Sequence, residues 1–206
     1  PRCTKIFVIN RRLVASLEHP KVQQLVVNMD RLSAELAPLI PHVDMALAAF
    51  GVGKGSASMP DDEVRKIEVT YPAAFASAAK TAGARVMALM TAVGADPNAS
   101  SKYLRNLGEK ETLARSVGFD FLGLYRPSVI LGNSNTPAAL GAAMALVDWA
   151  LPSRLHSIHK NDLARAMVMQ SEAAFLDLAH GTGQERPAVK TLEYAEMRAF
   201  FVQGDR

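Results

Sequence analysis

Short apolar runs alternate with longer amphipathic stretches along most of this chain. Each run is rich in aliphatic or β-branched residues and ends in a polar, proline or glycine break, which is the pattern of a buried strand. The predicted strands cover Lys5–Ile9, Gln24–Val27, Val43–Phe50, Arg85–Thr91, Phe119–Tyr125 and Val189–Tyr194.

The stretches between these runs carry helix boundaries. Asp30 and Asp162 are predicted N-caps, Gly83 and Gly118 are predicted stops, and Pro72 is expected to kink the helix that contains it. The predicted helices cover Arg31–Leu39, a segment from Pro60 towards Ala82, a segment from Ser100 or Ser101 to about Val117, Thr136–Trp149, and a segment from Leu163 onward.

Strands that alternate with helices in this way predict an α/β protein with a doubly wound parallel sheet, covered by helices on both faces. The chain has 206 residues, enough to bury a substantial core. We therefore expect a single domain over residues 1–206.

Composition narrows the function classes. The net charge is only +3 and the basic residues are scattered, so the charge indicates a solvated surface and no nucleic-acid role. The single cysteine, Cys3, excludes an internal disulfide and favours a reducing compartment. No apolar run approaches the ~18 residues of a membrane span, and no secretory signal is visible. These features predict a cytoplasmic protein, with a mitochondrial location left open.

Several sequence motifs favour plain structural readings. The loop Gly51–Gly55 is not a G-x-G-x-x-G fingerprint, and a flexible loop is its most common role, although Lys54 is a candidate phosphate contact. His156 and His159 have no further histidine at ligand spacing, so no metal site is predicted. The chain contains no nucleophile elbow, zinc-protease motif or P-loop.

Two other features depend on their context. A helical tyrosine such as Tyr103 is more often structural than catalytic, but Tyr103 follows the strand end at Thr91, and Arg126-Pro127 ends the next strand. A pair such as Arg11-Arg12 usually marks a solvated turn. At the end of the second strand of a nucleotide-binding sheet, such an arginine can pair with the 2′-phosphate of NADP.

Taken in order, the segments resemble an atypical short-chain dehydrogenase/reductase family, the oxidoreductase group that includes the human Tat-interacting protein. The resemblance spans nearly the whole chain. The segments that carry it are KIFVINRR, VVNMDRL, VDMALAAFG, VRKIEVTYPAAFASAAKTAG, VGADPNASSKYLRNLGEKE, GFDFLGLYRPSVILG and IHKNDLARAM.

This resemblance implies a Rossmann-like NAD(P)-binding domain, NADP(H) as cofactor, a small carbonyl substrate and a Ser/Thr–Tyr–Lys active site. Thr91 then stands at the first active-site serine, Ala92 at the second, and Tyr103 is the proton donor or acceptor. For the cofactor, the resemblance implies that Arg11 or Arg12 holds the 2′-phosphate, Asp30 lies near the adenine, Phe50 and Gly51 line the crevice, and Arg126, Pro127 and Val129 border the nicotinamide and substrate.

The chain departs from the family pattern at Leu107, which occupies the lysine position of Tyr-x-x-x-Lys. In the family mechanism the lysine charge favours tyrosinate, whose unperturbed pKa is ~10, and the same lysine holds the nicotinamide ribose. Leu107 can do neither, so the sequence predicts impaired catalysis.

A second departure lies at the first strand. Lys5–Ile9 resembles the second strand of the fold, which predicts an N-terminally truncated sheet whose first βα unit and phosphate-binding glycine loop are missing. The second and fourth strands would then face a gap of about two strand spacings, roughly 9–10 Å. An upstream segment, direct pairing of these strands, or a strand from a protein partner would satisfy their backbone groups, in that order of preference.

Three functions follow from these features. The chain is a NADP(H)-dependent reductase, a non-catalytic interaction or assembly subunit derived from that family, or a nucleotide-binding regulatory module without turnover. Family membership with impaired catalysis is the favoured hypothesis.

Overall fold

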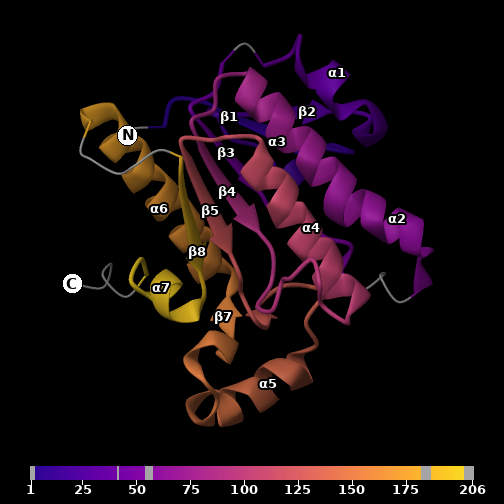
Figure 1. Cartoon of the computed structure of the whole chain (residues 1–206), viewed down its shortest axis with the longest axis vertical. Helices are drawn as coiled ribbons and strands as arrows, with labels where there is room; N and C mark the ends of the chain where they lie inside the picture. Colours follow the sequence, from indigo (N-terminus) through magenta and orange to yellow (C-terminus); the bar gives the residue numbers. More distant parts are fainter. Residues whose placement is uncertain (1–2, 41, 54–57, 182–186, 202–206) are drawn as a thin grey trace.

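Parallel strands form the centre of the molecule (Figure 1). The computed structural model describes residues 3–40, 42–53, 58–181 and 187–201. The smaller sheet pairs β1 (Ile6–Asn10) with β2 (Val22–Val26). The larger sheet has four strands in the order β3 (Met45–Ala48), β4 (Val86–Met90), β5 (Phe121–Tyr125) and β8 (Ala188–Leu192). A third, short pair joins β6 (Ile130–Leu131) to β7 (Ile158–His159). Every pairing is parallel.

Helices connect these strands and cover both faces of the larger sheet. The helical elements are η1 (Ala15–Leu17), η2 (Met29–Arg31), α1 (Leu32–Leu36), α2 (Asp61–Arg65), the π-helical turn η4 (Lys66–Thr70), α3 (Tyr71–Thr81), α4 (Lys102–Ser116), α5 (Ala138–Val147), η5 (Asp148–Ala150), η6 (Ser153–Leu155), α6 (Lys160–His180) and α7 (Tyr194–Arg198). Helices α3 and α4 lie on one side of the sheet, and α6 lies on the other (Figure 1).

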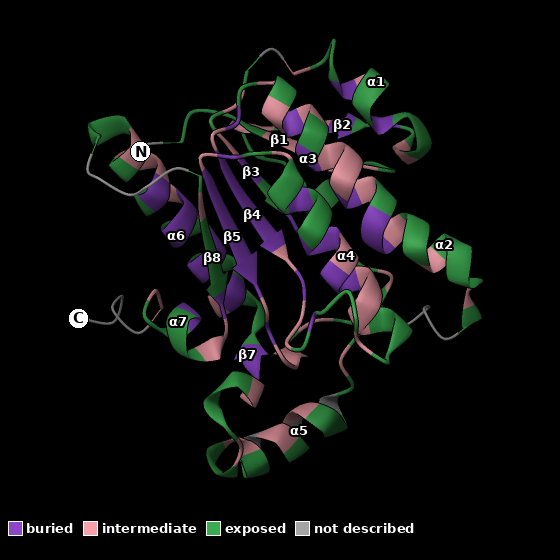
Figure 2. Ribbon diagram, in the orientation of Figure 1, coloured by how far each residue is buried: buried purple, intermediate pink, exposed green. Residues whose placement is uncertain are grey.

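The middle of the larger sheet is the most buried part of the fold. All five residues of β5 are buried, as are four of the five in β4 (Figure 2). On one face, Ala76 of α3 and Ala114 of α4 pack against Leu89 and Leu122. A sheet covered on both faces needs such continuous apolar strands. The α/β, Rossmann-like parallel architecture predicted from the sequence is confirmed.

The two sheets are not joined by backbone pairing. β1 pairs only with β2, and β3 pairs only with β4, so within the described residues no strand covers the other edge of β1 or of β3. The spatial order matches the doubly wound order 3-2-1-4-5-6 with the place of the central first strand open. β1 and β3 do not pair directly, and the assignment of β1 to the second strand of the fold stays a prediction.

Side chains of α3 link the two sheets in place of backbone hydrogen bonds. Phe75 packs against the cluster of the larger sheet and also against the cluster that contains Leu25 and Leu32. Phe7 and Ile9 of β1 join this second cluster. The smaller sheet is thus held to the fold by apolar contacts with one helix.

Three local predictions were wrong or incomplete. Asn28, not Asp30, caps the turn after β2, and its side chain accepts the Asp30 N–H. The helix expected to reach Leu39 ends at Leu36, because Pro38 has no N–H to donate to the carbonyl four residues earlier. His159, not Asp162, caps α6 by accepting the Asn161 N–H.

The kink expected at Pro72 takes the form of the π turn η4. Proline has no N–H to donate, and its ring clashes with the backbone four residues earlier in a regular helix. That earlier residue is Glu68, at the centre of η4, and Pro72 lies within the first residues of α3. The wider turn interrupts the helix before the proline, and Glu68 is buried within it.

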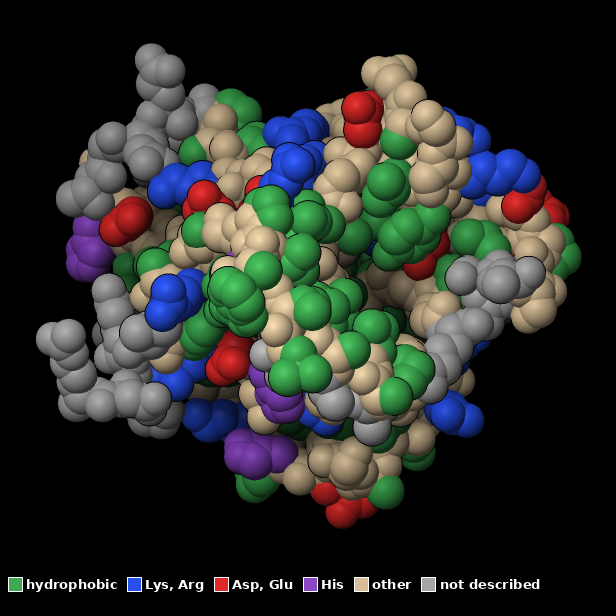
Figure 3. Space-filling view, turned by 90° about the horizontal axis from the view of Figure 1, so that it is seen from below, with side chains coloured by type: hydrophobic (Ala, Val, Ile, Leu, Met, Phe, Trp, Pro, Cys, Tyr) green, Lys and Arg blue, Asp and Glu red, His purple; other side chains and the backbone are tan. Residues whose placement is uncertain are grey.

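Helix α5 lies away from the β1-β2 sheet and the four-stranded sheet, at the lower end of the molecule in Figure 1. It and the following turn expose apolar side chains: Leu146 is 76% exposed and Trp149 is 83% exposed. Figure 3, seen from below, shows hydrophobic side chains gathered on one face. The predicted helix Thr136–Trp149 is confirmed in outline, as α5 followed by η5.

Candidate functional site

Helix α4 lies beside the carboxyl ends of the central strands, the edge at which open parallel sheets bind ligands. One stripe of α4 is buried and consists of Leu107, Lys110, Glu111 and Ala114. Spacings of three and four residues place these side chains on one face of a helix. Two of them carry charges, and a buried charge requires a partner.

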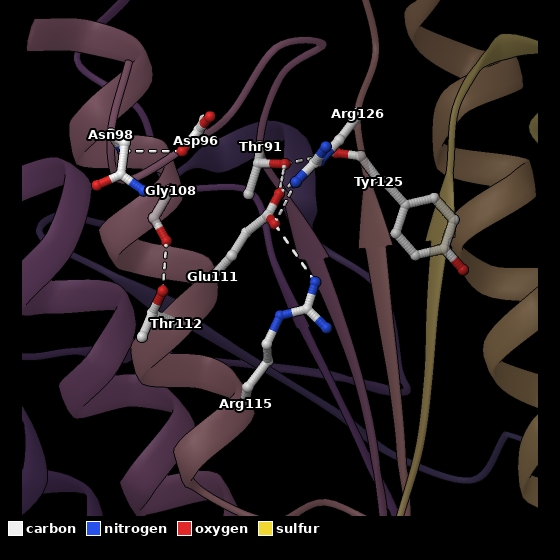
Figure 4. Close-up of polar contacts among 9 residues, drawn as sticks. All are labelled: Thr91, Asp96, Asn98, Gly108, Glu111, Thr112, Arg115, Tyr125 and Arg126. Atoms are coloured by element: carbon white, nitrogen blue, oxygen red, sulfur yellow. Dashed lines mark hydrogen bonds and ion pairs between the residues drawn. The ribbon is translucent and has the colours of Figure 1, made fainter.

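Glu111 joins the ends of β4 and β5 (Figure 4). Arg126 donates Nε to Oε1 of Glu111 at 2.8 Å and Nη2 to Oε2 at 2.6 Å. Thr91 donates its hydroxyl to Oε1 at 2.8 Å. Hydrogen bonding to Glu111 raises the pKa of Arg126 above its ordinary value. Two predicted site residues, Thr91 and Arg126, are therefore brought together by a carboxylate that the sequence interpretation did not single out.

The Thr91 hydroxyl is already engaged in this arrangement. Thr91 is buried, and its Oγ1 also lies 3.3 Å from the carbonyl oxygen of Tyr125. A hydroxyl has one proton to donate, and here Glu111 accepts it. The role of Thr91 as an active-site hydroxyl stays a prediction.

Tyr103 lies in the first turn of α4, apart from the Glu111 cluster. Its side chain is 48% exposed, whereas Leu107, one turn later, is 1% exposed. The hydrogen bonds of the Thr91 and Arg126 side chains go to Glu111 and to backbone, not to Tyr103. Partial burial, and secondarily the Glu68 carboxylate, raise the pKa of Tyr103 above its ordinary value.

A second buried ion pair involves Lys110, the residue before Glu111 on the same buried stripe of α4. Lys110 Nζ lies 3.2 Å from Oε2 of Glu68, and the side chains are 2% and 5% exposed. The other carboxylate oxygen of Glu68, Oε1, accepts the N–H of Val52 at 2.9 Å. Consecutive residues of α4 thus hold the loop after β3, through Glu68, and the ends of β4 and β5, through Glu111.

The predicted phosphate contacts lie at the end of β1. Arg11 and Arg12 are exposed and, with Asn10 and Val14, line a hollow of about 440 Å³. Gln24 of β2 fixes this turn, because its side chain accepts the N–H of Val14 and donates to the Val14 carbonyl, both at 2.9 Å. Two exposed guanidinium groups in a hollow suit a phosphate ester, so the residues present fit this part of a nucleotide.

Asp30 lies after β2 and is already partnered. Its Oδ1 accepts the Tyr71 hydroxyl at 2.7 Å and lies 2.5 Å from Lys66 Nζ. The hydrogen bond from Lys66, followed by that from Tyr71, lowers the pKa of Asp30 below its ordinary value. Asp30 is exposed, and its predicted contact with adenine stays a prediction.

The remaining predicted residues occupy the loops at the same edge. Phe50 is half-buried and its ring lies 5.7 Å from that of Phe75, while Gly51 lies beside Glu68. Pro127 is buried and Val129 is half-buried, after β5. Lys54 lies outside the described residues.

Sequence interpretation missed Glu68, Lys110 and Glu111, although a signal was present for two of them. Lys110 and Glu111 lie three and four residues after Leu107 and four and three residues before Ala114, so they fall on an otherwise apolar helical stripe. Lysine and glutamate are almost never fully buried unless they are paired, so charges on such a stripe indicate buried ion pairs. Glu68 carried no comparable signal, because its burial depends on the π turn.

Within the described ranges, no group of three or more His, Cys, Asp or Glu side chains is placed to hold a metal ion. In the same part of the chain, no helix combines the length and apolar composition needed to cross a bilayer.

Two proteins, one from a fungus and one from rat, are similar to this chain in sequence. No protein-family profile matches the chain. "Protein fmp52, mitochondrial" of Aspergillus niger is 32% identical over 142 residues, which are 69% of this chain and 60% of that protein. Rat "Protein HTATIP2" is 30% identical over 130 residues, which are 62% of this chain and 52% of that protein. The chain thus matches less than two thirds of the length of these two relatives.

Solved structures agree on the fold. The structure of MoeE5 in complex with UDP-glucose and NAD matches 95% of this chain and 72% of its own, with a TM-score of 0.61 and 12% identity. At that identity the likeness establishes the Rossmann-like fold alone. Together with the sequence relatives, it leads to one assignment. The chain is a relative of the fmp52 and HTATIP2 proteins, and it has a Rossmann-like fold.

Proposed function

We propose that this protein is an NAD(P)-binding member of the oxidoreductase-like group in which catalysis is impaired, with NADP(H) as its preferred nucleotide and a small carbonyl compound as the ancestral substrate class. The bound nucleotide would supply or accept a hydride. Arg11 and Arg12 would hold its 2′-phosphate, and the loop at Phe50 and Gly51 would line its crevice.

The environment of Tyr103 carries the proposal of impaired catalysis. A tyrosine that exchanges a proton near neutral pH needs a nearby cation to lower its pKa. Leu107 occupies the position of that cation and is buried, and the influences on Tyr103 both raise its pKa. General acid–base catalysis contributes about 10²–10⁴-fold, so its loss would leave little turnover.

The ionisation of Tyr103 tests this directly. We expect its phenol to titrate above pH 10, because burial and Glu68 raise its pKa above the ordinary value of 10.0. Tyrosine-ring NMR of wild type and Tyr103→Phe would assign the signal and follow it with pH. The other three tyrosines serve as internal controls. Ionisation of Tyr103 well below pH 9 would contradict the proposal, since a shift of one unit already requires about 1.4 kcal/mol of net stabilisation.

Nucleotide affinity provides the second test. We expect residues 1–206 by themselves to bind NADPH only weakly, because within the described residues no glycine turn lies at the facing edges of β1 and β3 to donate backbone N–H groups to the diphosphate. Each such charge-assisted bond is worth about 1.5–3 kcal/mol. Isothermal titration calorimetry should give no constant tighter than millimolar. A micromolar or tighter constant would refute this expectation, and an Arg11→Ala/Arg12→Ala variant would then locate the binding.

A non-catalytic assembly subunit is the second candidate function. Within the described residues, no strand pairs with the other edge of β1 or of β3, and this favours the subunit, since a partner strand could pair with both by β-augmentation. Nucleotide affinity distinguishes a regulatory nucleotide-binding module from this subunit.

The proposed compartment is the mitochondrion. The Aspergillus relative is named mitochondrial, which favours that location over the cytoplasmic one predicted first.

A further inference from the structure

The buried pair Glu68–Lys110 connects three separate segments of the chain. Glu68 comes from the π turn η4, Lys110 comes from α4, and Val52, whose N–H donates to Glu68 Oε1 at 2.9 Å, comes from the loop after β3. The two oxygens of the carboxylate have different partners, since Oε2 lies 3.2 Å from Lys110 Nζ. One carboxylate thereby fixes a loop amide with respect to a helix.

This arrangement is a poor source of stability by itself. Removing two charges from water costs about as much as their attraction returns, so well-packed apolar residues often replace such pairs without loss. Burial lowers the pKa of Lys110 in spite of the Glu68 carboxylate beside it, which reflects that cost. A more specific consequence is geometric, because the pair fixes where the Val52 amide lies.

The position of that amide matters because the loop lies at the carboxyl end of β3. Gly51 is adjacent to Val52, and a Cβ built on Gly51 would lie 3.5 Å from Glu68 Oε1. Phe50, preceding it, packs against the core through Phe75. The loop is therefore held from both ends: by ring packing at Phe50 and by the carboxylate at Val52.

We propose that Glu68 and Lys110 are positioning residues that hold the Phe50–Gly53 loop against α4 and so set the shape of the nucleotide crevice. This inference rests on the proposed function for its purpose, but the loop geometry can be tested without any nucleotide. Lys110 does not replace the cation lost at Leu107, since it lies seven residues beyond Tyr103 and is paired with Glu68.

The test uses a double variant, Glu68→Leu/Lys110→Met, which removes both charges together and leaves no charge unpaired. Its matched control is Arg65→Met/Glu109→Leu, which removes the neighbouring exposed ion pair between α2 and α4. Hydrogen exchange of the Val52 amide is followed by NMR in each protein, with the amides of β4 and β5 as a measure of global stability. Calorimetry with NADPH is run in parallel.

In wild type, we expect the Val52 amide to exchange more slowly than that of Gly51, although both lie in a loop. In Glu68→Leu/Lys110→Met, Val52 should exchange at least about tenfold faster, because its acceptor is gone, while β4 and β5 keep their protection. Glu68→Gln retains an acceptor oxygen and should preserve the slow exchange. The control pair should change neither.

A Val52 amide that exchanges as fast as Gly51 in wild type would overturn the inference, and this result does not depend on any variant folding. Unchanged protection of Val52 in the double variant would also overturn it, as would a loss spread equally over β4 and β5. If wild type binds NADPH measurably, the double variant should bind at least about tenfold more weakly. If wild type shows no binding at any concentration, the proposed function fails, while the exchange result still decides the role of the pair.

Discussion

Glu111→Ala should lower the midpoint of thermal unfolding by roughly 6–20 °C. Removing one partner of a buried ion pair costs about 3–5 kcal/mol, because the remaining charge is left without compensation. In a chain of this size each kcal/mol corresponds to about 2–4 °C. Here the Arg126 guanidinium would lose its carboxylate partner, and the Thr91 hydroxyl would lose the shorter of its two contacts. Differential scanning calorimetry measures the change.

The matched control is Glu109→Ala, two residues earlier on the same helix. Glu109 pairs with Arg65 at the surface, and their side chains are 37% and 51% exposed. Exposed pairs contribute about 0–1 kcal/mol, so this variant should move the midpoint by less than about 4 °C. Equal effects of the two variants would mean that Glu111 does not hold the ends of β4 and β5 together.

Gly108→Ala should destabilise the fold by about 1–3 kcal/mol or more, although alanine is the better helix former. A Cβ at Gly108 would lie 2.1 Å from the nitrogen of Pro97 and 2.2 Å from the carbonyl carbon of Asp96. Both atoms belong to the backbone, so α4 or the loop before it must shift. Chemical denaturation should report the loss as a lower midpoint with an unchanged slope.

Gly141→Ala in α5 provides the comparison for this glycine. Its Cβ would lie 3.7 Å from Leu131 Cδ2, an ordinary contact, so the helix-propensity gain of about 1 kcal/mol should appear without a clash. If Gly108→Ala is as well tolerated as Gly141→Ala, then α4 does not approach the Asp96-Pro97 loop as closely as described.

The fold could largely be predicted from hydrophobic patterning, because fully apolar strands such as Val86–Met90 allow few alternatives. The place of β1 in the sheet order was predicted from the family resemblance, in which Lys5–Ile9 corresponds to the second strand. The ends of the helices were harder to predict. Helix α1 ends before Pro38, and the effect of Pro72 appears as a π turn one turn earlier.

The candidate site was harder to predict than the fold. Thr91 and Arg126 were singled out separately, but their common partner Glu111 depends on where α4 packs across two strand ends. Glu68 is buried within the π turn η4, and no sequence period indicates that turn. Ion pairs between residues far apart in the sequence therefore could not be predicted without the three-dimensional structure. Strands and helices could be predicted, because they depend on local patterning.

The proposed function is a nucleotide-binding protein in which Leu107 occupies the position of the cation that would activate Tyr103. The most direct test is NADPH oxidation by the full chain with small aldehydes and quinones, followed by loss of the reduced-nicotinamide absorbance in wild type, Tyr103→Phe and Leu107→Lys. The account predicts no oxidation above the buffer rate in wild type, no change in Tyr103→Phe, and no recovery in Leu107→Lys alone. Wild-type turnover that Tyr103→Phe abolishes would contradict it and would make the chain an active reductase despite Leu107.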